Sequence, residues 1–532
     1  MLDGGFPILS ALILWPAIAA CVVLGLRQTR TIRLVALAAS LVELGGSALL
    51  LVWFDADSAR PQFTERYSWI PSIGADYLVA VDGLSVAFPL MTSLLTTSVI
   101  LASWTAIDSL RRLFFALLLL LESITVGTFC AMDLALFFLF WEMSPIPLYF
   151  LIGLWGTGPR RRVAASQYTL MMLAGGVLIL FGIVLLAISH AEVQGAPLPS
   201  GLTFGYHALL SSDVGADVES AIFWLLVLGF AIKTPLFPFH TWLPMAAAEG
   251  SAGAIALLTG IKLGVYGLLR VALPLAPHAA VRYGWLLAAL GLIGGLYGAL
   301  LALRQTNFKR LLAYASISHV GLAVAALAAL NVTALQGTLL QMLNFSLVSG
   351  GLFIIAGFMH QRLGSTEMTG IGGLLRPMPL LGSFLFMLGL ASIGVPGTSS
   401  FVGEFMMLAG MFDLNAGFAL AALPTLILSA AYFLGFYRRA FLGPTIPPTH
   451  QDHADLRPRE LIVVSVLTAC SIVLGLFPNL AIRLSDTSSL TWIKRIGGGY
   501  PDHPSAFASA IPADEYETGE AKGSEVVNRR SY

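Results

Sequence analysis

Long apolar runs, each close to the length that crosses a bilayer, limit most strongly what this chain can fold into. Examples are residues 6–26, 134–156 and 460–480, where charged residues are few. A helix needs about 20 residues to cross the hydrocarbon core, and continuous runs do not fit the alternating strands of a barrel. Charged residues make up only 11% of the chain, against roughly a quarter in soluble domains. We therefore predict an all-α polytopic membrane protein.

Runs of this kind predict about 14 transmembrane helices. They are expected near residues 6–26, 33–54, 83–104, 113–132, 134–156, 164–189, 219–242, 252–274, 280–303, 309–330, 332–358, 378–411, 416–440 and 460–480.

Basic residues predict the orientation. The loops after odd-numbered spans hold about 17 Lys and Arg, against about four on the other side. The more basic side should be cytoplasmic, so both termini are expected on the non-cytoplasmic side of a bacterial cytoplasmic (inner) membrane. Lys plus Arg equals Asp plus Glu at 29 each, and this balance argues against a nucleic-acid partner.

Two expected spans have interrupted interiors. In the seventh, Pro235 and Pro238 follow Lys233, and in the twelfth the segment 394–400 precedes Glu404. Proline removes a helical hydrogen bond and clashes with the preceding turn, so helices 7 and 12 should be broken. Paired interruptions at corresponding places are typical of inverted repeats with an ion path at their midplane. We therefore expect two inverted five-helix repeats.

The resulting domain organisation has five parts. The expected order is spans 1–3 at residues 1–105, a first five-helix repeat (spans 4–8) at 106–275, a second at 276–442, a final span at 443–482 and a polar, partly disordered tail at 483–532. The tail begins with a mildly amphipathic stretch and ends in a segment too polar to form its own core.

Three ionisable residues within the expected spans suggest ion chemistry. A lysine at the centre of a membrane helix costs roughly 2.5–3.5 kcal/mol, and Lys233 and Lys262 occur in neighbouring spans. Glu142 lies in the fifth span, where it could stabilise the charge of Lys233 as an ion-pair partner. The alternative is that Glu142 is a hydrogen-bonded structural carboxyl.

Further candidates extend this series along the chain. His319 and Glu404 follow in later spans, whereas Glu122 and Glu43 are weaker candidates. Each could instead be a packing residue satisfied by neighbouring helices. Together the main five form a line of acid, base, base, imidazole and acid, which suits proton transfer across a membrane.

Redox and nucleotide motifs are missing from the sequence. It has no Gly-x-Gly-x-x-Gly after a strand, no phosphate loop, no clustered cysteines and no convincing haem or metal histidine pair. We expect no cofactor in this chain, so the energy source should lie outside it.

Several motifs resemble one known family. They are Phe140-Trp141-Glu142, the segment from Lys233 to Pro244, Lys309 to Tyr314, Gly394-Val395-Pro396-Gly397 and Phe401 to Phe405. The chain is similar to the antiporter-like membrane subunits of respiratory complex I and to their relatives in multisubunit cation/proton antiporters and membrane-bound hydrogenases. The similarity covers most of the chain, about spans three to thirteen.

The resemblance implies a role for each matching residue. Glu142 and Lys233 would be the family's ion pair, Lys262 the central proton carrier, His319 part of the link to the second half-channel, and Glu404 the terminal residue near the exit. A glutamate at that last place is most similar to the M-type subunit. The implied partners are other antiporter-like subunits, quinone-site subunits and the lipid bilayer.

The chain also departs from the family pattern. Met245, Ala246 and Ala247 stand where Asp-Ala-His is usual, Asn307 replaces a common aspartate, and Asn344 stands where histidine is frequent. These differences indicate a divergent paralogue, in which a relay would pass through water or serine instead.

The leading hypothesis is therefore proton translocation within a complex I-like NAD(P)H or ferredoxin:quinone oxidoreductase, by a relay and without a redox site in this chain. One alternative is a subunit of a Na⁺(K⁺)/H⁺ antiporter or membrane-bound hydrogenase without quinone chemistry. A third hypothesis is a degenerate scaffold, which the costly buried charges argue against.

Overall fold

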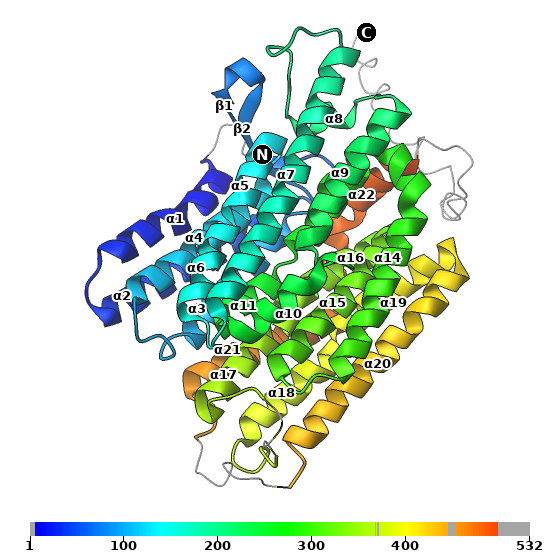
Figure 1. Cartoon of the computed structure of the whole chain (residues 1–532). Helices are drawn as coiled ribbons and strands as arrows, with labels where there is room; N and C mark the ends of the chain where they lie inside the picture. Colours follow the sequence, from blue (N-terminus) through cyan, green and yellow to red (C-terminus); the bar gives the residue numbers. More distant parts are fainter. Residues whose placement is uncertain (1–5, 368, 370–371, 445–453, 498–532) are drawn as a thin grey trace, which may run out of the picture.

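A computed structural model describes residues 6–367, 369, 372–444 and 454–497 as a bundle of long helices that run in roughly the same direction (Figure 1). Eleven helical segments in this part are long and apolar enough to cross a membrane, and α3 (Ala87–Ala102) and α18 (Pro379–Ser392) are shorter apolar helices. The all-α membrane fold is confirmed, whereas the total of about 14 spans stays a prediction.

The N-terminal part contains three helices and one small sheet. Helices α1 (Ile8–Gly25), α2 (Thr29–Trp53) and α3 (Ala87–Ala102) flank an antiparallel hairpin of β1 (Gln62–Ile70) and β2 (Ala75–Val81), joined by the turn η1 (Pro71–Ile73). This hairpin was not among the elements expected from the sequence. Glu65 on β1 accepts a hydrogen bond from the backbone N–H of Leu9 (2.7 Å), so the hairpin satisfies a free donor at the start of α1.

The first expected five-helix group runs from α4 to α13. Its elements are α4 (Arg111–Cys130), α5 (Leu134–Met143), α6 (Pro145–Trp155), α7 (Arg161–Val193), the short α8 (Tyr206–Leu210), α9 (Ala216–Lys233), η2 (Phe239–Thr241), α10 (Trp242–Glu249), α11 (Ala252–Gly260), α12 (Leu263–Gly267), the π-helical η3 (Leu268–Ala272) and α13 (Leu273–Leu275).

The second expected group runs from α14 to α20. It contains α14 (Pro277–Leu303), α15 (Phe308–Leu327), α16 (Val332–Asn344), the π-helical η4 (Phe345–Ser349), α17 (Gly350–Leu363), α18 (Pro379–Ser392), α19 (Ser399–Leu414) and α20 (Ala416–Ala440). The inverted relation between the two groups stays a prediction.

Both expected helix breaks are present. The seventh span ends as α9 at Lys233 and resumes at α10, and the twelfth is divided into α18 and α19. Gly394 and Gly397 between them have φ of 70° and 92°, a backbone region that glycine enters without steric cost.

Two further breaks differ from the expected continuous spans. The fifth span divides at Ser144, before Pro145, and the eighth divides at Ile261 and Lys262 between α11 and α12. Lys262 has φ −91° and ψ 59°, outside the helical region. The lysine therefore lies at an interrupted point of its helix, where backbone groups are free to bind other partners.

The described part of the chain ends in a helix, formed by the stretch expected from the sequence to be mildly amphipathic. After α21 (Pro458–Leu476), α22 (Asn479–Gly497) packs with Trp492 buried, and the indole N–H of Trp492 donates to the Leu269 carbonyl oxygen (2.9 Å). The expected domain boundary at residue 482 falls inside α22. The remaining tail, residues 498–532, lies outside the described residues.

Candidate functional site: a line of buried ionisable side chains

Lys233 is the last residue of α9, where the helix dipole favours a positive charge. Its ammonium donates to the Ser144 hydroxyl (2.5 Å) and to the Trp141 carbonyl oxygen (3.3 Å), and it lies 4.0 Å from the centre of the Trp141 ring. Since α5 ends at Met143, the Trp141 carbonyl is one of the four at a helix end without a helical partner. The break in the fifth span thus supplies the acceptors that make Lys233 tolerable.

Glu142 lies next to this contact but faces another helix. Within the described residues it forms no ion pair with Lys233 at 4.0 Å or less, and its Oε1 is buried without a hydrogen-bond partner. A Cβ added at Gly176 on α7 would overlap the Glu142 carboxyl group. The direct ion pair expected from the sequence is therefore not formed in this arrangement, because the carboxyl points toward α7 while the ammonium bonds Ser144.

Lys262 is the most isolated charge in the line. Only 7% of this residue is exposed, and its ammonium donates to the Ser316 hydroxyl (2.7 Å) on α15. The ammonium also lies 4.7 Å from the centre of the Phe345 ring, at the start of the π-helical segment η4. A buried charge is costly unless it is paired and hydrogen-bonded. No carboxylate of the described residues forms an ion pair with Lys262, so Ser316 is its principal partner.

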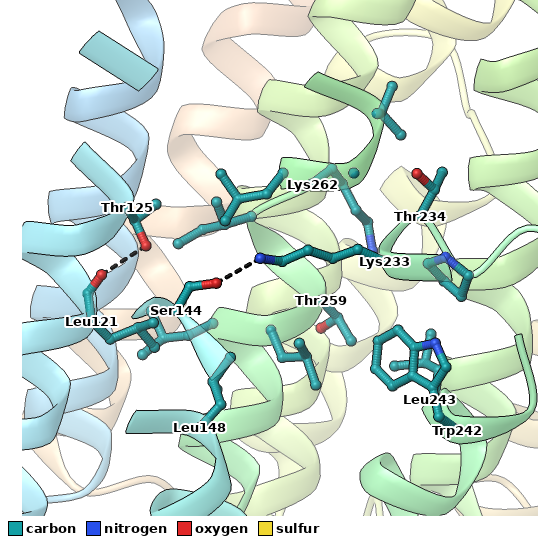
Figure 2. A pocket seen from close by; sticks show the side chains of 17 residues that line it. Leu121, Thr125, Ser144, Leu148, Lys233, Thr234, Trp242, Leu243, Thr259 and Lys262 are labelled. Atoms are coloured by element: carbon teal, nitrogen blue, oxygen red, sulfur yellow. Dashed lines mark hydrogen bonds between the residues drawn. The ribbon is translucent and has the colours of Figure 1, made fainter. Parts of the chain in front are cut away.

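A first cavity joins the two lysines (Figure 2). It has a volume of about 40 Å³, and its lining includes Ser144, Lys233, Thr234, Thr259 and Lys262. A cavity needs a volume of about 10–15 Å³ to hold one water molecule, and the water needs two to four polar partners. The cavity therefore has both the room and the polar groups for water between the two ammonium groups.

A second cavity of about 40 Å³ lies next to Ser316, the hydrogen-bond partner of Lys262. Its lining includes Ser316, His319, Asn344, Ser400 and Tyr432. Lys262 lines the first cavity and Ser316 the second, so the hydrogen bond between them connects the two spaces.

His319, which lines the second cavity, lies next to Glu404. The His319 Nδ1 lies 3.3 Å from Glu404 Oε1, and its Nε2 lies 3.3 Å from the Tyr432 hydroxyl. The histidine and glutamate side chains are only 10% and 5% exposed. A protonated imidazole would therefore form a buried ion pair with this carboxylate.

Asn344, which the sequence analysis singled out as an unusual residue, is connected to the same region. Its carbonyl oxygen accepts a hydrogen bond from the Ser399 hydroxyl (2.6 Å), and its amide donates to Ser400. Ser399 lies 2.9 Å from the Ser471 hydroxyl. Serine side chains at the start of α19 thus surround the asparagine.

Glu122 and Glu43 lie outside the line. Both are buried, at 1% and 0% exposure, and Glu122 accepts only a long hydrogen bond from the Ser40 hydroxyl (3.5 Å). Neither residue lines either cavity, although Leu121 and Thr125, which share α4 with Glu122, line the first. The structure therefore brings together Lys233, Lys262, His319 and Glu404, with Glu142 adjacent, and leaves these two carboxyls apart.

Tyr432 is the residue at this site that sequence reasoning missed. It lies on α20, 113 positions from His319, and no local pattern marks it. Ser144 and Ser316 had a weak signal, since each stands within a few residues of a candidate ionisable group.

Taken together, these features define a polytopic helical membrane protein with ionisable and hydroxyl side chains connected through two small internal cavities. Such an arrangement can pass protons between side chains and water. In the part of the chain that the structure describes, no group of three or more His, Cys, Asp or Glu could hold a metal ion.

The chain belongs to the NADH:quinone oxidoreductase/Mrp antiporter, TM family, which matches residues 131–429. This finding confirms the resemblance inferred from the motifs.

Relatives match the chain almost end to end. The NAD(P)H-quinone oxidoreductase chain 4 1 of Synechococcus sp. (strain JA-3-3Ab) is 37% identical, with 93% of this chain and 94% of the relative covered. The NADH-quinone oxidoreductase subunit M of Rickettsia typhi (strain ATCC VR-144 / Wilmington) is 33% identical, with 89% and 96% covered.

Solved structures show the same fold. A chain of respiratory complex I from Thermus thermophilus with bound NADH superposes with a TM-score of 0.84 at 29% identity, covering 92% of this chain and 100% of that chain. A chain of the Mrp complex from Dietzia sp. DQ12-45-1b gives a TM-score of 0.80 at 21% identity, with 92% and 100% covered. At that identity the second likeness concerns the fold alone.

Proposed function

We propose that this chain translocates protons as the M-type, or chain 4, membrane subunit of a complex I-like quinone oxidoreductase. Support comes from relatives with these names that match nearly the whole chain. The electron-transfer and quinone chemistry would belong to neighbouring subunits, with this chain as the non-redox, proton-pumping part. Its partners would be those subunits, its antiporter-like neighbours and the bilayer.

The hydrogen bond from Lys262 to Ser316 is the observation that carries this proposal. It connects the cavity of Lys233 with the cavity of His319 (2.7 Å). We infer a relay in which a proton passes from Lys233 through the first cavity to Lys262, then by Ser316 and the second cavity to His319 and Glu404. Hydroxyl groups and enclosed water can each accept one proton while releasing another.

Glu142 would control the start of this relay. A carboxylate beside Lys233 stabilises the ammonium form, so its withdrawal favours release of the proton. In the present arrangement the carboxyl faces Gly176 and the ammonium bonds Ser144. We infer that this is the separated state, and that a change in a neighbouring subunit would alternate Glu142 between α7 and Lys233.

The orientation also belongs to this proposal. The basic loops would face the cytoplasm and both termini the opposite side, as the positive-inside rule predicts for the sequence. The membrane would be the bacterial cytoplasmic membrane.

Replacement of Lys262 tests the relay directly. The assembly that contains this chain would be reconstituted in vesicles, and proton uptake per electron transferred would be measured for Lys262→Met. We expect the variant to lose most of the proton flux through this subunit, because methionine fills the site without carrying a proton.

Lys494→Met is the matched control, since Lys494 is exposed on α22. It should leave the ratio of protons to electrons unchanged. An unaltered ratio of protons to electrons in Lys262→Met, with normal assembly, would contradict the proposed relay.

A further inference from the structure

Arginine side chains gather where three helices begin, on the side of the molecule with the basic loops. They come from the start of α2, the start of α4 and the start of α21: Arg33, Arg111, Arg457 and Arg459. The segment between α3 and α4, with Trp104 and Thr105, lies among them. We call these four arginines with Thr105 the arginine cluster.

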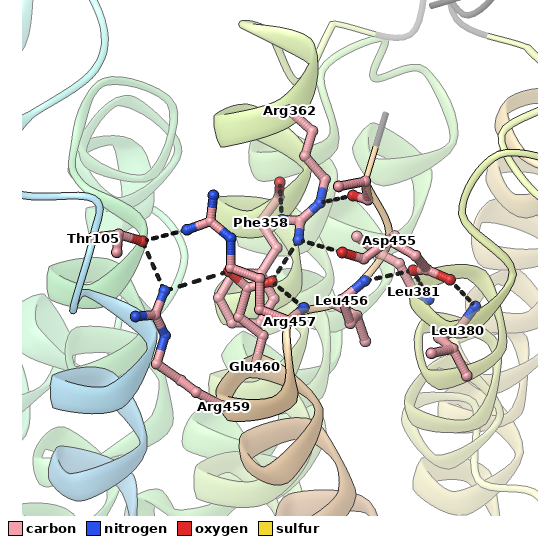
Figure 3. Close-up of polar contacts among 11 residues, drawn as sticks. Thr105, Phe358, Arg362, Leu380, Leu381, Asp455, Leu456, Arg457, Arg459 and Glu460 are labelled. Atoms are coloured by element: carbon pink, nitrogen blue, oxygen red, sulfur yellow. Dashed lines mark hydrogen bonds and ion pairs between the residues drawn. The ribbon is translucent and has the colours of Figure 1, made fainter. Parts of the chain in front are cut away.

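Two guanidinium groups of the arginine cluster converge on one hydroxyl (Figure 3). Arg457 Nη1 donates to the Thr105 hydroxyl oxygen at 2.9 Å, and Arg459 Nη2 donates to the same oxygen at 2.7 Å. Two like charges this close repel one another, even where water screens them. A neutral hydroxyl compensates little of that repulsion, so the geometry favours an anion nearby.

The described carboxylates near the arginine cluster neutralise only part of its charge. Glu460 is fully buried, with its closest ion pair to Arg362 (2.5 Å) and a longer one to Arg459 (3.7 Å). It also accepts a hydrogen bond from the backbone N–H of Arg457 (3.1 Å), so its single charge is shared among several donors. Asp455 accepts from the backbone N–H groups of Leu380 (2.7 Å) and Leu381 (3.0 Å) at the start of α18.

Among the described residues, the other acid near the cluster is Asp108, which pairs with Arg111 at 3.2 Å. Within the described residues, neither the Arg33 nor the Arg457 guanidinium has a carboxylate partner, and the Nε groups of Arg33 and Arg459 are buried without an acceptor. The cluster therefore keeps positive charge and unused donors.

The surroundings of the arginine cluster are those expected at the level of lipid headgroups. Exposed apolar residues follow it within the first turns of both spanning helices, with Leu34 on α2 and Ile462 on α21. Trp104 contacts the Arg33 guanidinium at 6.0 Å from its ring centre, and tryptophan is typical of the membrane interface. Arg457 and Thr105 are exposed, so a headgroup can reach them.

We propose that the arginine cluster binds the phosphate headgroup of an anionic phospholipid. Guanidinium groups match phosphate oxygens with paired hydrogen bonds, and basic pockets between membrane helices on the cytoplasmic side bind such headgroups. Arg457 and Arg459 would contact the phosphate, Arg33 would add charge, and the acyl chains would lie along α2 and α21. A bound lipid would join the loop before α4 to the start of α21.

Lipid binding by the purified, delipidated assembly tests this proposal. Phosphatidylglycerol would be titrated in neutral detergent and the bound lipid counted by native mass spectrometry, with phosphatidylcholine as the neutral comparison. We expect the variant Arg457→Gln with Arg459→Gln to bind phosphatidylglycerol roughly 30-fold more weakly, because two basic contacts are lost. If that variant fails to assemble, Arg457→Gln alone should weaken binding roughly fivefold.

Arg438→Gln with Arg439→Gln is the matched control, an exposed arginine pair at the end of α20 on the same side. It should bind as the wild type does, and so should Lys262→Met, which separates this proposal from the proton relay. The proposal would be overturned if the Arg457/Arg459 double variant bound phosphatidylglycerol as tightly as the Arg438/Arg439 control does. Displacement of the lipid by millimolar inorganic phosphate would also overturn it in favour of a free-anion site, and a cross-link from position 457 to a neighbouring subunit without lipid dependence would indicate a protein partner.

Discussion

Each buried lysine at this site is stabilised by an interruption in a helix. Lys233 ends α9 and bonds groups at the broken fifth span, while Lys262 itself stands between α11 and α12. Free carbonyls, hydroxyls and small cavities occur where the regular hydrogen-bond ladder stops. At the scale of single residues, the polar partner of each lysine is therefore a serine rather than a carboxylate.

Ser316→Ala tests the connection between the two cavities. Its hydroxyl is the acceptor for Lys262 and also lines the second cavity. Loss of a hydrogen bond to a buried charge costs about 1.5–3 kcal/mol, so we expect proton flux to fall about tenfold or more while electron transfer continues uncoupled. Ser318→Ala, two residues further along α15 and outside both cavity linings, is the control. Equal flux in the two variants would contradict the role of Ser316.

Gly176→Ala tests the position of Glu142. Alanine normally stabilises a helix by about 1 kcal/mol relative to glycine, but here its Cβ would overlap the Glu142 carboxyl group. We expect the substitution to displace the carboxyl from α7 and lower the pumping ratio without reducing the amount of assembled protein. Gly435→Ala on α20, with nothing within 4 Å of the added Cβ, should leave pumping unchanged. Normal pumping in Gly176→Ala would mean that Glu142 does not need this position.

At the scale of elements, one buried ion pair away from the proposed relay joins the N-terminal hairpin to the eighth span. Arg270 in the π-helical η3 pairs with Asp82, which follows β2, at 2.5 Å, with side chains 5% and 10% exposed. Its second nitrogen donates to the Met132 sulfur (2.8 Å). The hairpin is thereby fixed to the irregular half of the eighth span.

Asp82→Ala should strongly destabilise this junction. It would leave the Arg270 charge buried without its partner, at a cost of about 3–5 kcal/mol, whereas apolar replacement of both partners is often neutral. The double variant Asp82→Leu with Arg270→Met should therefore recover much of the stability. The measurement is the fraction of assembled complex that survives a heating series. A single variant as heat-resistant as the wild type would show that the pair contributes little.

At the scale of the whole molecule, the proposed relay would cross from the first helix group to the second. Lys233 and Lys262 belong to α9 and to the break before α12, while Ser316, His319 and Glu404 belong to α15 and α19. The helix α22 forms hydrogen bonds with both groups. The indole N–H of Trp492 donates to the Leu269 carbonyl oxygen in the first group (2.9 Å), and Asp486 accepts from the Gln336 amide in the second (2.5 Å). A relative movement of the two groups would therefore act directly on the Lys262 to Ser316 contact.

The family includes Mrp antiporters, so two modes of energy supply have to be distinguished by a measurement on the whole assembly. If quinone chemistry in neighbouring subunits drives this chain, vesicles with the purified assembly should exchange no Na⁺ for H⁺ without an electron donor. Addition of NAD(P)H or reduced ferredoxin with a quinone should start proton uptake. Rapid Na⁺/H⁺ exchange without any donor would favour the antiporter instead.

Local sequence was sufficient for the membrane class, the two helix breaks at Lys233 and before Glu404, and the five main ionisable candidates. Apolar runs, prolines and charges within spans act through the backbone next to them and through the cost of leaving water, so they can be recognised one segment at a time. The break at Lys262 could not be recognised in this way, because no proline marks it and its partner Ser316 is 54 positions away.

The tertiary structure alone decided which side chains meet. It placed Tyr432 beside His319 and turned Glu142 toward Gly176 rather than onto Lys233. It also paired Arg270 with Asp82 across 188 positions and formed the β1–β2 hairpin within an otherwise helical chain. These outcomes depend on the packing of distant helices, because a short hydrogen bond or ion pair forms only where two backbones hold its atoms within about 3 Å. Sequence by itself determined that charges lie inside a membrane protein, and the packing determined the order in which they could pass a proton.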